Sequence, residues 1–155
     1  MNNTLRSKHQ KRIISILLIG SSISGKTIMI KQYHGPPFEQ TIIPSGNTFI
    51  TNSFEYKHDN KAENILVKIW NSPDTFINLN TINVSQGIML LYDITDHHDF
   101  IKLESMISKV KEAHDISTFP LIIVGNKIDL AEQRVVPYEQ GKALADKYNL
   151  PYFET

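Results

Sequence analysis

Continuous apolar runs alternate along the chain with segments that have helical spacing. The apolar runs predict buried strands at residues 13–19, 87–92 and 121–124, since parallel strands are covered on both faces. The helical segments lie at residues 25–34, 98–114 and 138–148. Alternation of this kind predicts an α/β fold with a mostly parallel, doubly wound sheet.

A hairpin is predicted before the second buried strand. Residues 48–56 and 65–70 have strand character and flank the turn-prone residues 57–60. The hairpin places one antiparallel strand at the edge of the sheet. A last strand begins at Tyr152.

The turn that follows the first strand has the pattern of a phosphate-binding loop. Glycines at both ends let the chain turn sharply, so that backbone N–H groups can surround phosphate oxygens. Lys26 supplies positive charge for the outer phosphates, and Thr27 supplies a hydroxyl suited to Mg²⁺. The candidate residues are Gly20, Ser21, Ser22, Ile23, Ser24, Gly25, Lys26 and Thr27. The simpler alternative is a Gly/Ser-rich turn with a surface lysine.

A second polar segment follows the strand at residues 121–124. Asp129 can accept hydrogen bonds from the N1–H and 2-amino groups of guanine, which adenine lacks on that edge. Asn126 can bridge the base and the phosphate loop, and the aliphatic stem of Lys127 can lie along the ring. Together with the upstream loop, this segment indicates specificity for a guanine nucleotide.

Length and charge narrow the function further. A chain of 155 residues predicts one domain, here residues 13–155, after a basic flexible tail at residues 1–12. The 16 basic and 16 acidic residues balance, which argues against general nucleic-acid binding. The absence of cysteine excludes disulfides, thiolate metal sites and a cysteine-linked lipid anchor in this chain. The apolar runs are too short to cross a bilayer, so we expect a cytoplasmic protein, with any membrane association provided by partners.

These segments resemble the Ras superfamily of small GTPases, and the Rab branch in particular. The resemblance rests on residues 17–27, 67–70, 91–96 and 123–130. It implies a P-loop NTPase fold, GTP or GDP with Mg²⁺ as ligands, and a regulatory role in vesicle trafficking or signalling. It also implies effector, exchange-factor or GTPase-activating partners, and places Phe38 where the family braces the guanine.

The sequence departs from this family in both segments that respond to the nucleotide. Asn71 stands where the family has an aspartate that holds a Mg²⁺-bound water, and Thr75 stands at the position of the glutamine that orients the attacking water. No catalytic residue is therefore intact, and we expect weak metal binding and slow or absent hydrolysis. The Mg²⁺-ligating hydroxyl corresponds by count to Ser45, although Thr41 and Thr48 are alternatives.

The sequence ends at Thr155, before the point where the family has its final helix. We expect the helix to be absent from this chain, so that a second domain or partner would cover the apolar sheet surface. The alternatives are a fragment, or one half of a protein with several G domains. A nucleotide-bound scaffold that does not switch and, more distantly, a P-loop kinase are the other functional hypotheses.

Overall fold

The computed structural model describes residues 12–34, 41–42, 48–58, 61–73 and 79–155. Within these ranges, seven strands form one sheet in the order β2-β3-β4-β1-β5-β6-β7. The strands are β1 (Arg12–Gly20), β2 (Thr41–Ile42), β3 (Thr48–His58), β4 (Lys61–Pro73), β5 (Gly87–Asp93), β6 (Leu121–Asn126) and β7 (Tyr152–Glu154). The helices are α1 (Lys26–His34), α2 (Leu79–Asn83), α3 (His97–Ile101), α4 (Leu103–Ala113), α5 (Tyr138–Lys147) and the 3₁₀ helix η2 (Ile128–Gln133).

Strand directions divide the sheet into a parallel and an antiparallel part. Strands β4, β1, β5, β6 and β7 run parallel. Strand β3 pairs antiparallel with β4, and β2 pairs antiparallel with β3. The outermost strand is therefore β2 and not the predicted hairpin strand. Two residues carry no usable periodicity, so the sequence could not have revealed this strand.

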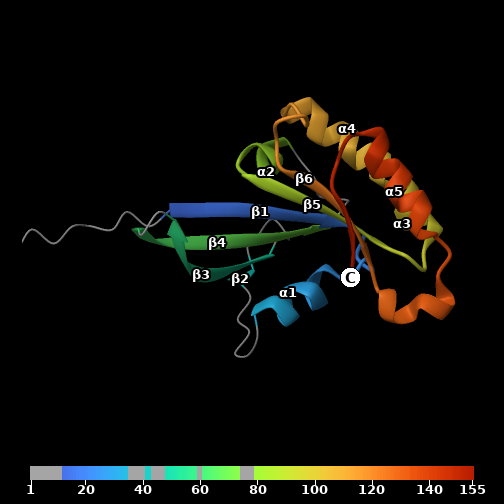
Figure 1. Ribbon diagram of the computed structural model, residues 1–155, viewed down its shortest axis with the longest axis horizontal. Coiled ribbons are helices and arrows are strands. Elements are labelled where there is room, and N and C mark those ends of the chain that lie inside the picture. Colours follow the sequence, from blue (N-terminus) through green and yellow to red (C-terminus); the bar gives the residue numbers. More distant parts are fainter. Residues whose placement is uncertain (1–11, 35–40, 43–47, 59–60, 74–78) are drawn as a thin grey trace, which may run out of the picture.

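Helices cover both faces of the sheet. Helix α1 lies on one face, and α3, α4 and α5 lie on the other (Figure 1). Side chains of β1 alternate between the two faces: Leu17 and Ile19 belong to the cluster under α3–α5, whereas Leu18 packs with Ile30 of α1. This arrangement confirms the predicted doubly wound α/β fold.

The central strands agree with the sequence prediction, and the helices agree less closely. Helix α3 begins after Asp96, whose carboxylate accepts hydrogen bonds from the backbone N–H groups of His98 and Asp99. The single helix predicted at residues 98–114 is instead two helices that meet at Lys102. The sequence did not reveal this break, because Lys102 keeps a right-handed helical backbone and the apolar spacing continues across it. Arg12, which we assigned to the tail, is the first residue of β1.

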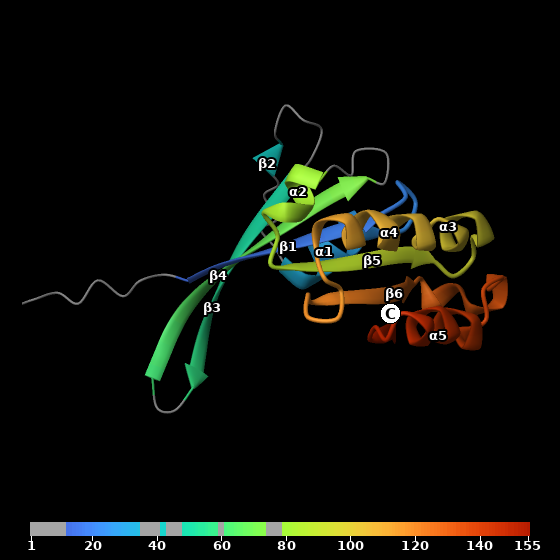
Figure 2. The same ribbon diagram turned by 90° about the horizontal axis from the view of Figure 1, so that it is seen from above.

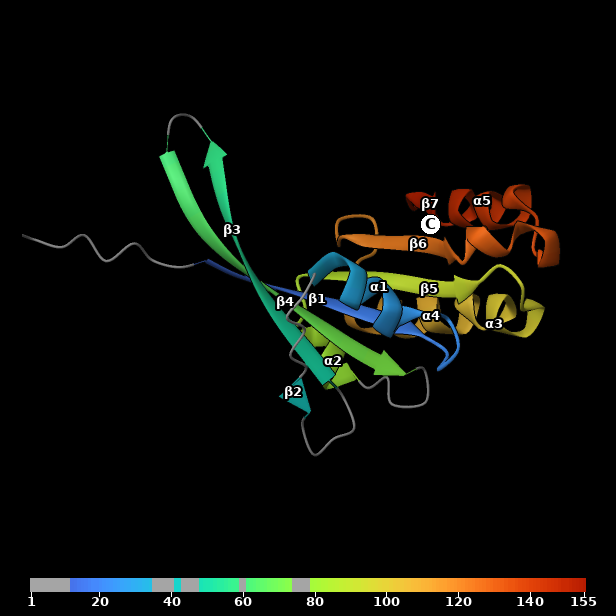
Figure 3. The ribbon, with the colours of Figure 1, turned by 90° about the horizontal axis from the view of Figure 1, so that it is seen from below.

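The carboxyl ends of the central strands lie at one edge of the sheet. Strands β1, β5 and β6 run side by side and end at Gly20, Asp93 and Asn126 (Figures 2 and 3). In open α/β sheets, ligands bind outside this edge. The fold thus brings both predicted nucleotide-binding segments to the same end of the molecule.

None of the helices in the described part of the chain is long and apolar enough to span a membrane.

Candidate functional site

The predicted phosphate loop connects β1 to α1 through two glycines that cannot be replaced freely. A Cβ on Gly20 would lie 2.4 Å from the Leu91 carbonyl oxygen. Gly25 has a φ of +87°, in the left-handed region that favours glycine. A Cβ there would also lie 2.3 Å from Nδ2 of Asn126. The loop therefore packs tightly against β5 and against the second polar segment.

Lys26 is the charged side chain enclosed by this loop. It is only 5% exposed, and its ammonium donates hydrogen bonds to the carbonyl oxygens of Gly20, at 2.7 Å, and of Ser21. Ser22 and Ile23 form the exposed outer side of the loop. The loop thus holds a buried positive charge at the start of α1, an arrangement that suits a phosphate group.

Asn126 joins the two candidate segments across the edge of the sheet. Its Nδ2 donates to the carbonyl oxygen of Ser24 at 2.8 Å, although the two residues lie 102 positions apart. Ser24 is fully buried, and its own hydroxyl donates to the Ser21 carbonyl oxygen. The loop after β6 is thereby fixed against the phosphate loop.

Lys127 is held in an unusual backbone conformation beside Asn126. Its φ and ψ of 72° and 42° lie in the left-handed region, which is uncommon for a long side chain. The Lys127 ammonium lies 2.6 Å from Oδ2 of Asp93, at the end of β5. Strain of this kind persists where surrounding contacts fix it, and it is concentrated at functional sites.

Asp93 is a charged carboxylate at the end of β5. Burial raises its pKa, but hydrogen bonds from Lys127 and from the N–H and hydroxyl of Thr95 outweigh burial and hold the pKa below its ordinary value. Asp93 therefore stays ionised and anchors the Lys127 ammonium, while the stem of Lys127 lines the neighbouring cavity.

A cavity of about 610 Å³ lies between α1 and the segment that follows β6. Its lining residues are Gly25, Ile28, Met29, Gln32, Asn126, Lys127, Ile128, Asp129, Leu130 and Thr155. Thr155 closes one side, because its N–H donates to the Gly125 carbonyl and its carbonyl accepts from the Ile128 N–H. Apolar and polar groups line the cavity in similar proportion, and its size suits a small organic ligand.

Thr27 and Asn71 meet next to the phosphate loop. Nδ2 of Asn71 donates to the Thr27 hydroxyl at 3.1 Å, and Oδ1 of Asn71 is buried without a hydrogen-bond partner among the described residues. Two neutral oxygens supply little charge for Mg²⁺, which usually takes one or two carboxylates together with substrate phosphates. The pair fits Mg²⁺ that arrives with a nucleotide, and it fits a free ion poorly.

Several residues singled out from the sequence cannot be placed. Phe38, Ser45 and Thr75 lie outside the described residues. Thr41 and Thr48 are described by their backbone alone, in β2 and β3.

Other site residues emerge only from the structure. Asp93 lies in the segment 91–96 on which the family resemblance rests, but the sequence predicted no role for its carboxylate, and Ile28 and Gln32 line the cavity from α1. Asp99 lies buried in α3, and its Oδ2 accepts the Asp93 N–H at 2.9 Å. Helical spacing places Ile28 and Gln32 on one face of α1, which is the sequence signal for those two residues.

Comparison with known proteins identifies the family. The Ras family model matches residues 15–155. Ras-related protein Rab-27A of Homo sapiens is 30% identical over 154 residues, which cover 92% of this chain and 70% of that protein. GTP-binding protein ypt2 of Schizosaccharomyces pombe is 32% identical over 155 residues, which cover 97% and 75%. Ras-related protein RIC1 of Oryza sativa subsp. japonica is also 32% identical, with coverage of 92% and 71%. The chain therefore belongs to the Ras family and is a Rab-like, GTP-binding small GTPase.

Proposed function

We propose that this protein holds GDP or GTP at the carboxyl edge of the sheet, with the base in the cavity beside Asp129 and the phosphates in the loop around Lys26. One observation carries the proposal: the hydrogen bond from Asn126 to the Ser24 carbonyl. It joins the segment suited to a base and the segment suited to phosphates. A nucleotide is the ligand that has both parts.

Each candidate residue has a distinct role in this proposal. Lys26 contacts the β- and γ-phosphates, and the backbone of residues 20–25 surrounds them. Asp129 selects guanine through its N1–H and 2-amino groups, and the stem of Lys127 flanks the ring. Phe38 braces the opposite face of the base.

For Mg²⁺ we propose the hydroxyls of Thr27 and Ser45, together with the nucleotide phosphates. The metal neutralises phosphate charge when it is bound. Because Asn71 is neutral and donates to the Thr27 hydroxyl, we expect this protein to depend on Mg²⁺ less than a homologue with an aspartate at that position.

We further propose that hydrolysis is slow or absent. Thr75 is too short to position a water as a glutamine does. Asp74 stands at the position of a glycine whose backbone N–H contacts the γ-phosphate in the family, so its negative charge would oppose GTP. The protein then acts as a regulatory switch in vesicle trafficking whose GDP form predominates. It is cytoplasmic and reaches membranes through effector or exchange-factor partners.

Calorimetric titration with GDP, GTP and ATP, with and without Mg²⁺, tests the binding proposal. We expect GDP and GTP to bind and ATP to bind far more weakly, and Asp129→Ala should remove that preference. A preference for ATP would instead favour the P-loop kinase hypothesis. Equal affinity for GDP and a non-hydrolysable GTP analogue, without a structural difference between the two complexes, would favour the non-switching scaffold.

Single-turnover hydrolysis of radiolabelled GTP tests the second part. Turnover at about 10⁻⁴ per second or faster, the intrinsic rate of an ordinary small GTPase, would contradict the proposal of impaired hydrolysis. The nucleotide-binding proposal would be unaffected by that result.

A further inference from the structure

A chain of hydrogen-bonded polar side chains runs from the segment after η2 through the last strand to β5. The Arg134 guanidinium donates one hydrogen bond to each carboxylate oxygen of Glu154, both at 2.8 Å. The Tyr152 hydroxyl donates to Glu154 at 2.7 Å, and the hydroxyls of Tyr152 and Tyr92 are hydrogen-bonded to each other at 2.7 Å. Arg134, Glu154, Tyr152 and Tyr92, here called the Arg134–Tyr92 chain, thus connect β5, β7 and the segment after η2.

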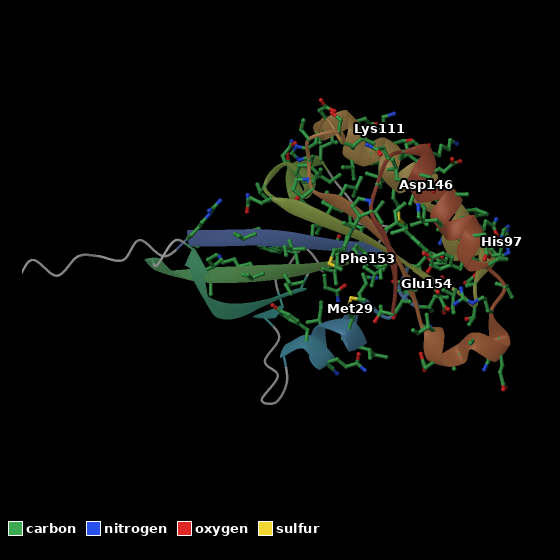
Figure 4. The ribbon with its side chains drawn as sticks, viewed as in Figure 1. Met29, His97, Lys111, Asp146, Phe153 and Glu154 are labelled. Atoms are coloured by element: carbon green, nitrogen blue, oxygen red, sulfur yellow. The ribbon has the colours of Figure 1, made fainter. Side chains whose placement is uncertain are left out.

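The ion pair joins two segments that both contribute lining residues to the cavity. Arg134 directly follows η2, which contributes Ile128, Asp129 and Leu130 to the lining. Glu154 is the last residue of β7 and directly precedes Thr155, which lines the cavity. In Figure 4, Glu154 lies on the side of the molecule where η2 leads into α5. The ion pair therefore adds to the backbone hydrogen bond from Ile128 to Thr155 in holding these two segments together, without itself lining the cavity.

The fold leaves space for this chain at a glycine in a helix. A Cβ on Gly141 of α5 would lie 2.4 Å from the Tyr152 hydroxyl and 2.5 Å from the Tyr92 hydroxyl. Glycine inside a helix costs about 1 kcal/mol relative to alanine. At this position the absence of a Cβ leaves room for the two hydrogen-bonded tyrosines.

The charges of the chain are fixed over the working pH range. The Arg134 hydrogen bonds hold the pKa of Glu154 below its ordinary value, and Glu154 in turn raises the pKa of Arg134. Burial, followed by the hydrogen bonds with Tyr92 and Glu154, raises the pKa of Tyr152 above its ordinary value. A bidentate pair of this kind is a permanent connection, because no member titrates near neutral pH.

We propose that Arg134 and Glu154 are positioning residues for the nucleotide base, and that their ion pair holds the Asp129 side of the cavity at the spacing that guanine recognition requires. This inference rests on the proposed function. Loss of the pair weakens the connection between the two segments, so the base is held less firmly although none of its own contacts is removed. Coupling energies transmitted in this way correspond to about 3- to 30-fold changes in a rate or affinity.

The first test measures dissociation and association of a fluorescent GDP analogue from the full chain. Glu154→Gln and Arg134→Gln should each speed dissociation about 3- to 30-fold with little change in association. Arg134→Lys keeps the charge and should restore part of the effect, and the double variant should be no worse than either single variant. Lys142→Gln is the control, because Lys142 pairs with Asp146 on the exposed side of α5.

The second test separates positioning from a general effect on stability. Inosine diphosphate (IDP) lacks the 2-amino group from which Asp129 would accept a hydrogen bond. The affinity ratio of GDP to IDP therefore reports how well the base is placed. Glu154→Gln should lower this ratio, whereas a general loss of stability would weaken both nucleotides equally. Tyr152→Phe keeps the ion pair and provides a second variant, for which a smaller effect is expected.

The outcomes distinguish this inference from the proposed function. If the wild-type protein binds GDP and Glu154→Gln leaves both the dissociation rate and the GDP to IDP ratio unchanged, the inference is wrong and the proposed function stands. If the wild-type protein binds neither GDP nor GTP, both are overturned. If Lys142→Gln has the same effect as Glu154→Gln, surface charge explains the result and the inference is again wrong.

Discussion

Replacing Asp99 by asparagine should make the protein more stable. Its carboxyl is only 2% exposed, and although Oδ2 accepts the Asp93 N–H, Oδ1 has no hydrogen-bond partner among the described residues. The buried Ser21 hydroxyl also lacks a partner of good hydrogen-bond geometry, although it lies near enough to Asp99 to oppose the rise in the pKa of that carboxyl. Asparagine keeps an oxygen for the Asp93 N–H and adds an NH₂ group that can donate to Ser21. A buried polar group left unsatisfied costs about 1–3 kcal/mol, and Asp99→Asn should raise the free energy of unfolding at neutral pH by a similar amount.

The pH dependence gives this prediction a definite sign. Burial raises the pKa of Asp99 above its ordinary value, although the Asp93 N–H and the Ser21 hydroxyl oppose the shift. The folded protein therefore disfavours the charged form, and the penalty applies above the folded-state pKa. As the pH falls through that pKa, the carboxyl is protonated and the penalty disappears. The advantage of Asp99→Asn should thus be largest at neutral pH and should shrink on acidification.

Urea unfolding followed by circular dichroism over a series of pH values measures this difference. Asp99→Ala leaves the Asp93 N–H without its acceptor and should destabilise the protein at every pH. Asp115→Asn is the matched control, since hydrogen bonds from the hydroxyl and N–H of Ser117 lower the pKa of this exposed carboxyl. Its charged form adds stability that is lost as the pH falls, so this variant should show the opposite sign at neutral pH. The reasoning fails if Asp99→Asn is no more stable than the wild type at pH 7, or if its advantage grows on acidification.

Three further predictions concern the nucleotide site. Asn126→Ala removes the hydrogen bond to the Ser24 carbonyl and should speed GDP release about 3- to 10-fold in a fluorescence chase; an unchanged rate would mean that the two loops are held by other contacts. Gly25→Ala combines a φ of +87° with a Cβ 2.3 Å from Asn126, and should abolish tight GDP binding by calorimetry while circular dichroism shows the fold retained. Asn71→Asp places a carboxylate beside the Thr27 hydroxyl and should increase the dependence of GTP affinity on Mg²⁺, a conclusion that equal Mg²⁺ titrations of variant and wild type would rule out.

The sequence predicted those parts of the fold whose signal is local and continuous. Strands β1, β5 and β6 are buried on both faces, so each is an uninterrupted apolar run. The short helix α2 was not predicted, because Ile82 is its one buried residue and a single residue has no period. Both candidate nucleotide-binding segments were proposed from their own residues, since the chemistry of each depends on a fixed local spacing.

Contacts that complete the site could not be predicted, because they join residues that are distant in sequence. Asp93 and Lys127 are 34 positions apart, and neither sequence neighbourhood indicates the other. Arg134 and Glu154 are ordinary charged residues until β7 is placed beside β6. Such partners depend on strand order, which residue spacing alone does not determine.

The hydrogen bond between Asn126 and Ser24 also has a consequence for how the protein folds. It closes only after β1 and β6, which are separated in the sheet by β5, have both taken their places. Contacts of such large sequence separation are expected late in folding, so the ligand site is complete only when the domain is. A nucleotide bound across this contact would select the finished fold, and at a hundred times its Kd it would add about 2.7 kcal/mol to the free energy of unfolding. Nucleotide supply in the cell would then regulate the abundance of the folded protein as well as its signalling state.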